Sequence, residues 1–281
     1  MNSLAAIDSM VGKQFKKQGF CVLEDALDGR DIDRLCGEAI DVCLGRRGFI
    51  ARNAAECRTV DDVNNHVIAV HFPHKISGLF REYVAHPSIT RVLTEIIGPN
   101  VKCMQSMIFM KSKGTPGQAW HQDEVFIPTT DRSLVGAWIA LDQATIDNGC
   151  LWVIPGSHRP GVLWDLRPHQ DPRFDDAPES FGFPFDEDAA VPVEVERGSI
   201  IFFHGHLLHR SLPNLAPSGY RRSYVNHYMS AESPLRWSGG IPKNLRDDYR
   251  DIVMVAGIDP RADLGLEDLS VPYYRTREQA A

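Results

Sequence analysis

Apolar residues recur along this chain with two different periods, and the change comes near residue 100. From Asp31 to Leu44 (DIDRLCGEAIDVCL) they fall at helical spacing. Residues 86–100 (HPSITRVLTEIIGPN) show the same period, with Pro87 suited to a first helical position and a Gly-Pro stop at the end. Residues 45–75 between them are polar, so we expect a long excursion there and a candidate lid over a site.

Beyond residue 100 the pattern changes to short apolar strands. These are VKCMQSMIFMK (101–111), LVGAWIALDQAT (134–145), CLWVIP (150–155), PVEVERGSIIFFHG (192–205) and YRRSYVNHYM (220–229). Asp147-Asn148-Gly149 predicts a hairpin between the second and third, and Arg197-Gly198 divides the fourth into a strand pair. Short strands without intervening helices favour an antiparallel sandwich or barrel.

The domain organisation follows from these patterns of apolar and polar residues. Residues 1–100 are expected to be mostly helical, residues 101–230 to form the strand core, and residues 231–281 to wrap it irregularly. Repeats and a linker that would force two domains are both lacking, so we expect one domain over 1–281.

Composition excludes several classes of protein. A formal net charge of -7 argues against a general nucleic-acid binder, and the chain lacks an apolar run long enough to span a membrane. The first residues do not resemble a secretory signal, and the last do not carry a peroxisomal tripeptide. Six scattered cysteines predict buried free thiols in a reducing compartment, so we expect a cytoplasmic protein. They are Cys21, Cys36, Cys43, Cys57, Cys103 and Cys150.

The first candidate chemistry is the stretch WHQDEVF, in which His121 and Asp123 lie two residues apart. On a strand such a pair projects to one side, whereas on a helix it diverges by about 200°. The flanking residues favour a strand or its end. A pair of this kind is more often two ordinary polar residues than half of a metal site.

A histidine cluster follows a distant apolar strand and strengthens the metal hypothesis. His204, His206 and His209 come directly after Ser199–Phe203. Two histidines and one carboxylate with open positions are typical of non-haem Fe(II) oxygenases, whereas structural zinc takes four closed ligands. The spacing does not select which histidine completes the set.

Arg221-Arg222-Ser223 opens the last strand and is a candidate carboxylate anchor. Arg221 and Ser223 share one face of that strand, and arginine presents paired donors to a carboxylate. A surface arginine is the simpler alternative. A turn at residues 216–219 predicts that this strand and the histidine segment are antiparallel neighbours, with Arg221 near His209.

Over roughly residues 14–230 the chain resembles the phytanoyl-CoA dioxygenase family of Fe(II)/2-oxoglutarate-dependent oxygenases. The resemblance rests on GFCVLED, QSMIFMK, WHQD, GAWIALDQATIDNGCLWVIPGSH, RGSIIFFHGHLLHRSLPN and YRRSYVNHYM, in that order. It implies a double-stranded β-helix (jelly roll), mainly β, with flanking N-terminal helices that brace one sheet.

The resemblance also implies roles for particular residues. His121 and Asp123 match the proximal iron ligands, and His209 matches the distal histidine that begins an H-x-S-x-x-N segment. Arg221 matches the 2-oxoglutarate arginine and Ser223 its hydroxyl partner. One extra residue in the preceding turn leaves Arg222 as an alternative. Trp138 and Gln105 fall where relatives line the co-substrate pocket, although both could be plain core residues.

The implied reaction uses Fe(II), 2-oxoglutarate and O2, and yields succinate and CO2 while a C–H bond of a small or mid-sized metabolite is oxidised. Because halogenating relatives lack the carboxylate ligand, Asp123 favours hydroxylation. Position alone suggests a substrate lining, drawn from His71, Phe72, His74, Met110, Phe126, Trp164 and Trp237. Two alternatives stay open: a non-redox, cupin-like metal enzyme and an inactive binding module.

Overall fold

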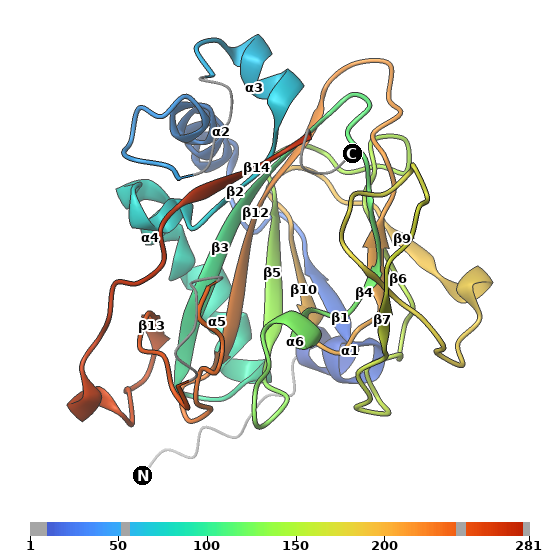
Figure 1. Cartoon of the computed structure of the whole chain (residues 1–281). Helices are drawn as coiled ribbons and strands as arrows, with labels where there is room; N and C mark the ends of the chain where they lie inside the picture. The colour runs from blue at the N-terminus through green and yellow to red at the C-terminus, as the bar shows by residue number, and fades with distance from the viewer. Residues whose placement is uncertain (1–9, 52–56, 240–245, 278–281) are drawn as a thin grey trace.

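The structure is a computed structural model that describes residues 10–51, 57–239 and 246–277 (Figure 1). The expectations about the extreme N- and C-terminal residues therefore lie outside the described part. Among the described residues, no helix is long and apolar enough to cross a membrane. All six cysteines are free thiols, and each is buried or partly buried.

Helices predominate among the described N-terminal residues. Its helices are α1 (Met10–Gln18), α2 (Gly29–Cys43), α3 (Val60–His66), α4 (Gly78–Val84) and α5 (Pro87–Ile96), with a short 3-10 turn, η1 (Pro73–Lys75). Asp28 caps α2 by accepting a hydrogen bond from the Asp31 amide, and Pro87 begins α5.

Two antiparallel sheets form the rest of the core. In spatial order, the large sheet is β1 (Phe20–Leu23), β10 (Ile200–His204), β5 (Val135–Ala140), β12 (Tyr220–Ser230), β3 (Val101–Ser112), β2 (Val67–His71) and β14 (Tyr273–Thr276), with β13 (Val253–Ala256) beside β3. The small sheet is β4 (Gln118–His121), β11 (His209–Ser211), β6 (Leu151–Val153) and β9 (Val191–Val193). Short elements complete the chain: α6 (Asp123–Phe126), β7 (Leu166–Arg167), β8 (Glu179–Ser180), η2 (Glu187–Ala189) and η3 (Ala262–Leu264).

The two faces of the large sheet have different partners. Its outer face packs on the helices, which Figure 1 shows to one side of it, and Tyr224 and Tyr228 donate hydrogen bonds to carbonyl groups of α4. Its inner face meets the small sheet through a separate apolar cluster that includes Trp138, Leu151 and Phe203. Two facing antiparallel sheets braced by helices confirm the predicted double-stranded β-helix.

The predicted hairpin at residues 147–149 is wrong. A turn does form, with Gly149 at φ 83° and the Asn148 side chain accepting a hydrogen bond from the Thr145 amide. However, β5 lies in the large sheet and β6 in the small one, so the turn carries the chain between the sheets. The same holds for β9 and β10 on either side of Arg197-Gly198, which do not pair with each other.

Two segments expected to be irregular contribute strands. Residues 67–71 form β2, a buried member of the large sheet, where a polar excursion was predicted. In the C-terminal region, β13 pairs with β3 and β14 pairs with β2. Their apolar runs are short and flanked by polar residues, so only the pairing partner stabilises them as strands.

Candidate metal centre

His121 and Asp123 come together where strand β4 ends and helix α6 begins. Gln122 between them has extended backbone angles, φ -128° and ψ 125°, so their side chains project to one side as the spacing predicted. The Gln122 side chain turns away, and its amide donates hydrogen bonds to the carbonyl oxygens of Val162 and His206. Gln122 thereby fixes the direction in which its two neighbours point.

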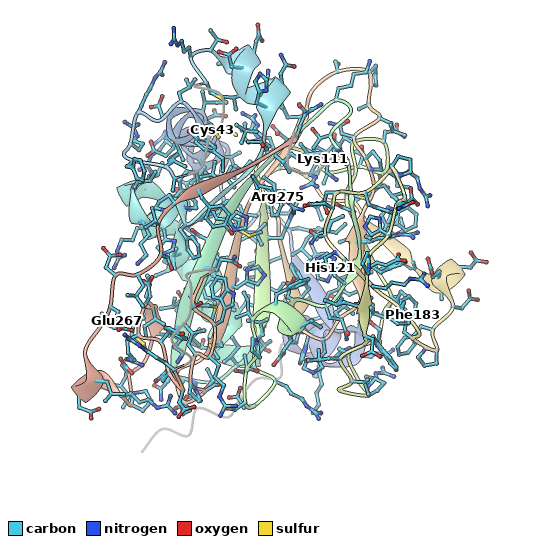
Figure 2. All side chains as sticks on the ribbon, viewed as in Figure 1. Cys43, Lys111, His121, Phe183, Glu267 and Arg275 are labelled. Carbon is cyan, nitrogen blue, oxygen red and sulfur yellow. The ribbon has the colours of Figure 1, made fainter. Side chains whose placement is uncertain are left out.

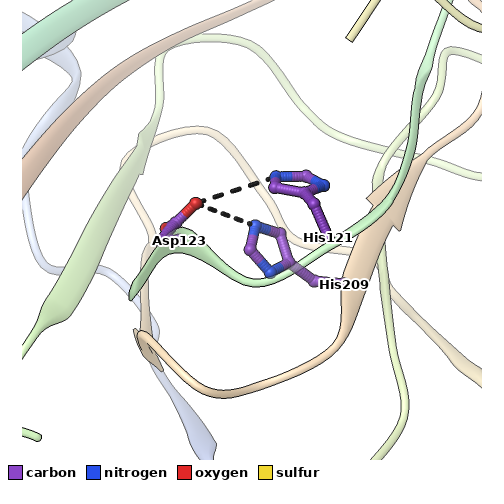
Figure 3. A group of neighbouring side chains, drawn as sticks. All are labelled: His121, Asp123 and His209. Carbon is purple, nitrogen blue, oxygen red and sulfur yellow. Dashed lines mark ion pairs between the residues drawn. The ribbon is translucent and has the colours of Figure 1, made fainter. Parts of the chain in front are cut away.

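His209 reaches the same point from the neighbouring strand. It lies opposite His121 in the antiparallel register of β11 and β4, and the two ring centroids are 4.0 Å apart. Nε2 of each histidine is 3.7 Å from Oδ1 of Asp123 (Figure 3). One ligand atom from each of the three side chains lies within 4.8 Å of the others, a spacing that could hold one metal ion.

Backbone carbonyl groups set the tautomers of both histidines. Nδ1 of His121 is 2.8 Å from the Ala119 oxygen, and Nδ1 of His209 is 3.0 Å from the Leu207 oxygen. Because a carbonyl only accepts, each Nδ1 carries a proton, and each Nε2 faces Asp123. Burial lowers the pKa of His121 to about 3, so this imidazole is neutral and able to bind a metal ion.

His227 on β12 orients the carboxylate. Its Nε2 donates a hydrogen bond of 2.9 Å to Oδ2 of Asp123, which leaves Oδ1 facing His121 and His209. Burial by itself raises the pKa of Asp123, but the nearby His209 and His227 outweigh it and hold this pKa well below its usual value. Sequence reasoning missed His227, although it follows Arg221 and Ser223 at the same period of two along β12.

The three candidate ligands open into a cavity of about 310 Å³ between the sheets. Arg221 lines it and is 3% exposed, and burial lowers its pKa to about 10, which leaves it a cation at neutral pH. Its Nε donates to the Gly149 oxygen at 3.1 Å and its Nη1 to the Ser223 hydroxyl at 3.3 Å. No described residue accepts a hydrogen bond from Nη2, so the guanidinium keeps donor capacity for a ligand.

Arg222 faces the opposite side of β12 from this cavity. It makes a two-armed ion pair with Asp142, with N–O distances of 2.8 and 2.7 Å. The alternation of a strand therefore leaves Arg221 as the cavity-facing arginine. The predicted pairing of its strand with the histidine segment is wrong, because β12 lies in the large sheet and β11 in the small one. Arg221 and His209 nevertheless line the same cavity from facing sheets.

The other candidate co-substrate residues are also found at the cavity. Trp138 lines it, with its ring 5.4 Å from the Arg221 guanidinium carbon. Gln105 lines it as well, and its amide lies 3.5 Å from Nδ1 of His71. Ser223 is fully buried and contacts Arg221 without being part of the lining.

The structure divides the suggested substrate lining. His71, Phe126 and Trp237 line the cavity. Met110 does not, since it points to the helix-covered face of β3 while Phe109 and Lys111 point inward. That expectation is corrected.

Three further suggested residues also lie outside the cavity lining. Phe72 is buried against Trp237, with a ring separation of 5.9 Å. His74 is held by the Ser106 hydroxyl, and Trp164 packs on Phe185.

Sequence reasoning also missed several charged and aromatic lining residues. Lys111 on β3 and Arg275 on β14 both reach the cavity, and Figure 2 shows them on one side of His121. Arg275 pairs with Asp175 at 3.1 Å and with Asp176 at 2.7 Å. Tyr273 stacks on His71 with ring centroids 4.2 Å apart. Arg275 and Tyr273 belong to the C-terminal strand β14, and no local pattern in the sequence predicts that this strand lies at the site.

Fold and site together define a double-stranded β-helix protein with a candidate metal centre of two histidines and one carboxylate. The model of the phytanoyl-CoA dioxygenase (PhyH) family matches residues 15–223, and the chain belongs to this family. Phytanoyl-CoA dioxygenase 1 of Oryza sativa subsp. japonica is 32% identical over 170 residues. That alignment covers 60% of this chain and 58% of the rice protein, so the chain matches less than two thirds of the relative's length.

Solved structures share the fold. The non-heme monooxygenase ThoJ, in its apo form, has a TM-score of 0.68 at 20% identity, and the match covers 96% of this chain and 89% of the ThoJ chain. The epimerase SnoN, in complex with Fe3+, alpha ketoglutarate and nogalamycin RO, has a TM-score of 0.64 at 19% identity. That match covers 85% of this chain and 92% of SnoN. At these identities the likeness concerns the fold alone.

Proposed function

We propose that this protein is an Fe(II)/2-oxoglutarate-dependent dioxygenase that hydroxylates a C–H bond of a small or mid-sized metabolite. The observation that carries the proposal is the His121–Asp123–His209 cluster, which shares one cavity with the buried Arg221. The donor set fits ferrous iron, since two imidazoles and one carboxylate leave coordination positions open.

In this proposal, His121, Asp123 and His209 hold the iron. When bound, Fe(II) with 2-oxoglutarate and O2 supplies the oxidising chemistry, and 2-oxoglutarate ends as succinate and CO2. The Ala119 and Leu207 carbonyl groups keep both ligand histidines in the Nδ1–H tautomer, and His227 keeps the Asp123 carboxylate turned toward them.

Arg221 is proposed to bind the far carboxylate of 2-oxoglutarate, with Ser223 holding the guanidinium in place. A buried cation with spare donors suits a carboxylate, because a charge-assisted hydrogen bond is stronger where water is excluded. Trp138 and Gln105 then line the same part of the cavity. The face of Trp138 supports the guanidinium through a cation–π contact.

The nature of the reaction and substrate is part of the proposal. Asp123 occupies the position that halogenating relatives leave open for a halide, which favours hydroxylation. A lining of His71, Phe126 and Trp237 suits an amphipathic metabolite, of the kind found in secondary metabolism. We further propose a cytoplasmic location, which is consistent with six free cysteines.

An anaerobic binding assay tests the proposal. The purified protein is mixed with Fe(II) and 2-oxoglutarate, and the weak visible charge-transfer band of the chelate is recorded. Air is then admitted and succinate is measured. We expect the band and succinate from the wild-type protein, and neither from His209→Ala, because one of the three ligands is gone.

His74→Ala serves as the matched control, since His74 is a buried histidine outside the cavity lining. It should keep the band. If the wild-type protein forms no band and His121→Ala changes nothing, the oxygenase proposal is wrong. A non-redox metal enzyme would bind the metal without producing succinate, and an inactive binding module would do neither.

A further inference from the structure

Lys111 is a buried basic side chain of the cavity that the proposed function does not use. It lies on β3 directly opposite Arg221 in the antiparallel register with β12, and both side chains line the cavity. Directly opposed residues of an antiparallel pair have neighbouring side chains on one face of the sheet. Lys111 is 5% exposed and Arg221 is 3% exposed. The large sheet therefore places two buried basic groups side by side, here called the Lys111–Arg221 pair.

Gly149 shows how closely the two basic groups approach each other. Its carbonyl oxygen accepts a hydrogen bond of 3.1 Å from Nε of Arg221. A Cβ at this glycine would lie 3.1 Å from Nζ of Lys111. Both basic groups thus lie against the same residue, and the lack of a side chain there leaves room for the lysine beside the arginine.

The hydrogen bonds of Lys111 do not neutralise its charge. Its Nζ donates to the hydroxyl of Ser211 at 3.0 Å and to the carbonyl oxygen of Leu212 at 2.6 Å, and both acceptors are neutral. An ammonium group has three donors, so one donor is left over. Neither Lys111 nor Arg221 forms an ion pair with a carboxylate in the described part of the chain.

The acidic residues whose charge reaches the Lys111–Arg221 pair are Asp175 and Asp142. Asp175 forms an ion pair with Arg275 at 3.1 Å, and Asp142 forms one with Arg222 at 2.7 Å. Their negative charge is therefore shared with other guanidinium groups. The Lys111–Arg221 pair keeps a surplus of positive charge, which an anion bound in the cavity would balance.

Like charges on directly opposed strand residues are destabilising, and the exclusion of water strengthens the repulsion. Burial lowers the pKa of Lys111 well below its usual value, and the neighbouring Arg221 lowers it further. Both causes act against the ammonium form. An anion bound between the two side chains acts in the opposite direction and favours that form.

We propose that Lys111 binds the far carboxylate of 2-oxoglutarate together with Arg221. This inference rests on the proposed function, in which Arg221 is the cation that binds that carboxylate. A carboxylate has two oxygens, so the guanidinium can donate to one of them and the ammonium to the other. The Lys111–Arg221 pair then selects 2-oxo acids that carry a second carboxylate.

An anaerobic binding titration tests this inference. The Fe(II)-loaded protein is titrated with 2-oxoglutarate and, separately, with 2-oxopentanoate, which has a methyl group in place of the far carboxylate. The charge-transfer band gives the dissociation constant of each acid. Lys111→Met should raise the constant for 2-oxoglutarate by roughly 10–100-fold, the equivalent of one charge-assisted hydrogen bond. It should not raise the constant for 2-oxopentanoate, because this acid has no second carboxylate for the ammonium group to bind.

Lys113→Met is the matched control, since Lys113 is an exposed lysine outside the cavity lining. It should keep the wild-type constants for both acids. Thermal unfolding shows whether Lys111→Met folds without the bonds to Ser211 and Leu212. If it does not, Lys111→Gln replaces it, because the glutamine amide keeps a donor but carries no charge, and the same difference between the two acids is expected.

A folded Lys111 variant that binds 2-oxoglutarate as tightly as the wild-type protein would overturn the inference, and Lys111 would then only tie β3 to the end of β11. Equal weakening of both acids would overturn it as well, because a distorted cavity would explain the loss. Both outcomes leave the proposed function intact. If the wild-type protein forms no band with 2-oxoglutarate, the proposed function is wrong, and this inference fails with it.

Discussion

At the scale of single residues, hydrogen bonds orient His121, Asp123 and His209 so that one potential metal-binding atom of each side chain faces the other two. His121 and His209 each donate a hydrogen bond from Nδ1 to a backbone carbonyl oxygen, and Asp123 accepts a hydrogen bond from His227 at one carboxylate oxygen. Each side chain is thus held in one orientation before any ion arrives. Ordering these groups in advance lowers the entropy that metal binding would otherwise lose.

His227→Ala should weaken Fe(II) binding by roughly 10–100-fold, as is usual for a partner of a metal ligand. The carboxylate loses the hydrogen bond that turns Oδ1 toward His121 and His209. The dissociation constant is measured by anaerobic Fe(II) titration with 2-oxoglutarate at saturation.

His227→Gln is the matched control variant, since the glutamine amide can still donate a hydrogen bond to Asp123. It should recover part of the affinity. Equal loss in both variants, with an unchanged unfolding midpoint, would show that the hydrogen bond does not orient Asp123.

At the scale of elements, alternate side chains of strand β12 face the cavity and the helix-covered core. Arg221 and His227 face the cavity, whereas Tyr224 faces the helices and Arg222 pairs with Asp142 on the side away from the cavity. Two adjacent arginines therefore belong to different environments, and the strand period decides which of them a ligand can reach.

Arg221→Lys should raise the KM for 2-oxoglutarate by roughly 10–100-fold, the equivalent of losing a charge-assisted hydrogen bond. Lysine keeps the charge but not the forked donors. Arg222→Lys should leave this KM unchanged and lower the unfolding midpoint, because it disrupts only the pair with Asp142. Succinate formation at varied 2-oxoglutarate measures the first effect. A raised KM in the Arg222 variant alone would reverse the assignment.

At the scale of the whole molecule, folding buries neutral imidazoles, and this ties stability to pH. His74 is 4% exposed, and burial lowers its pKa from 6.5 to about 3. Between these values the unfolded chain binds a proton at this residue and the folded chain does not. Stability from this group is therefore complete above pH 6.5 and declines as pH falls below it.

At pH 5, this one histidine should lower the free energy of unfolding by about 2 kcal/mol relative to pH 8. Urea unfolding at both pH values measures the change. The glutamine of the His74→Gln variant does not titrate in this range. The decrease in its free energy of unfolding between pH 8 and pH 5 should therefore be smaller by that amount. Identical losses in the two proteins would show that His74 is protonated in the folded state.

Much of the fold was predictable because helix and strand periods are local. The spacing of apolar residues placed α2 and α5, and the strands β3, β5 and β12. Which strands pair with each other was harder to predict from the sequence. The turn at residues 147–149 resembles a hairpin loop locally, but β5 and β6 bury their apolar faces in opposite sheets. The C-terminal strands were missed because β13 and β14 are short and depend on partners far away in the chain.

The sequence by itself determined that His121 and Asp123 project together, and that Arg221 and Ser223 share a face, since backbone geometry fixes both relations within a few residues. Only the tertiary structure decided which histidines gather. The register between β4 and β11 places His209 opposite His121. His204 at the end of β10 and His206 in the following turn lie beside Glu124 instead. Those choices follow from packing between segments eighty or more residues apart, which no local pattern encodes.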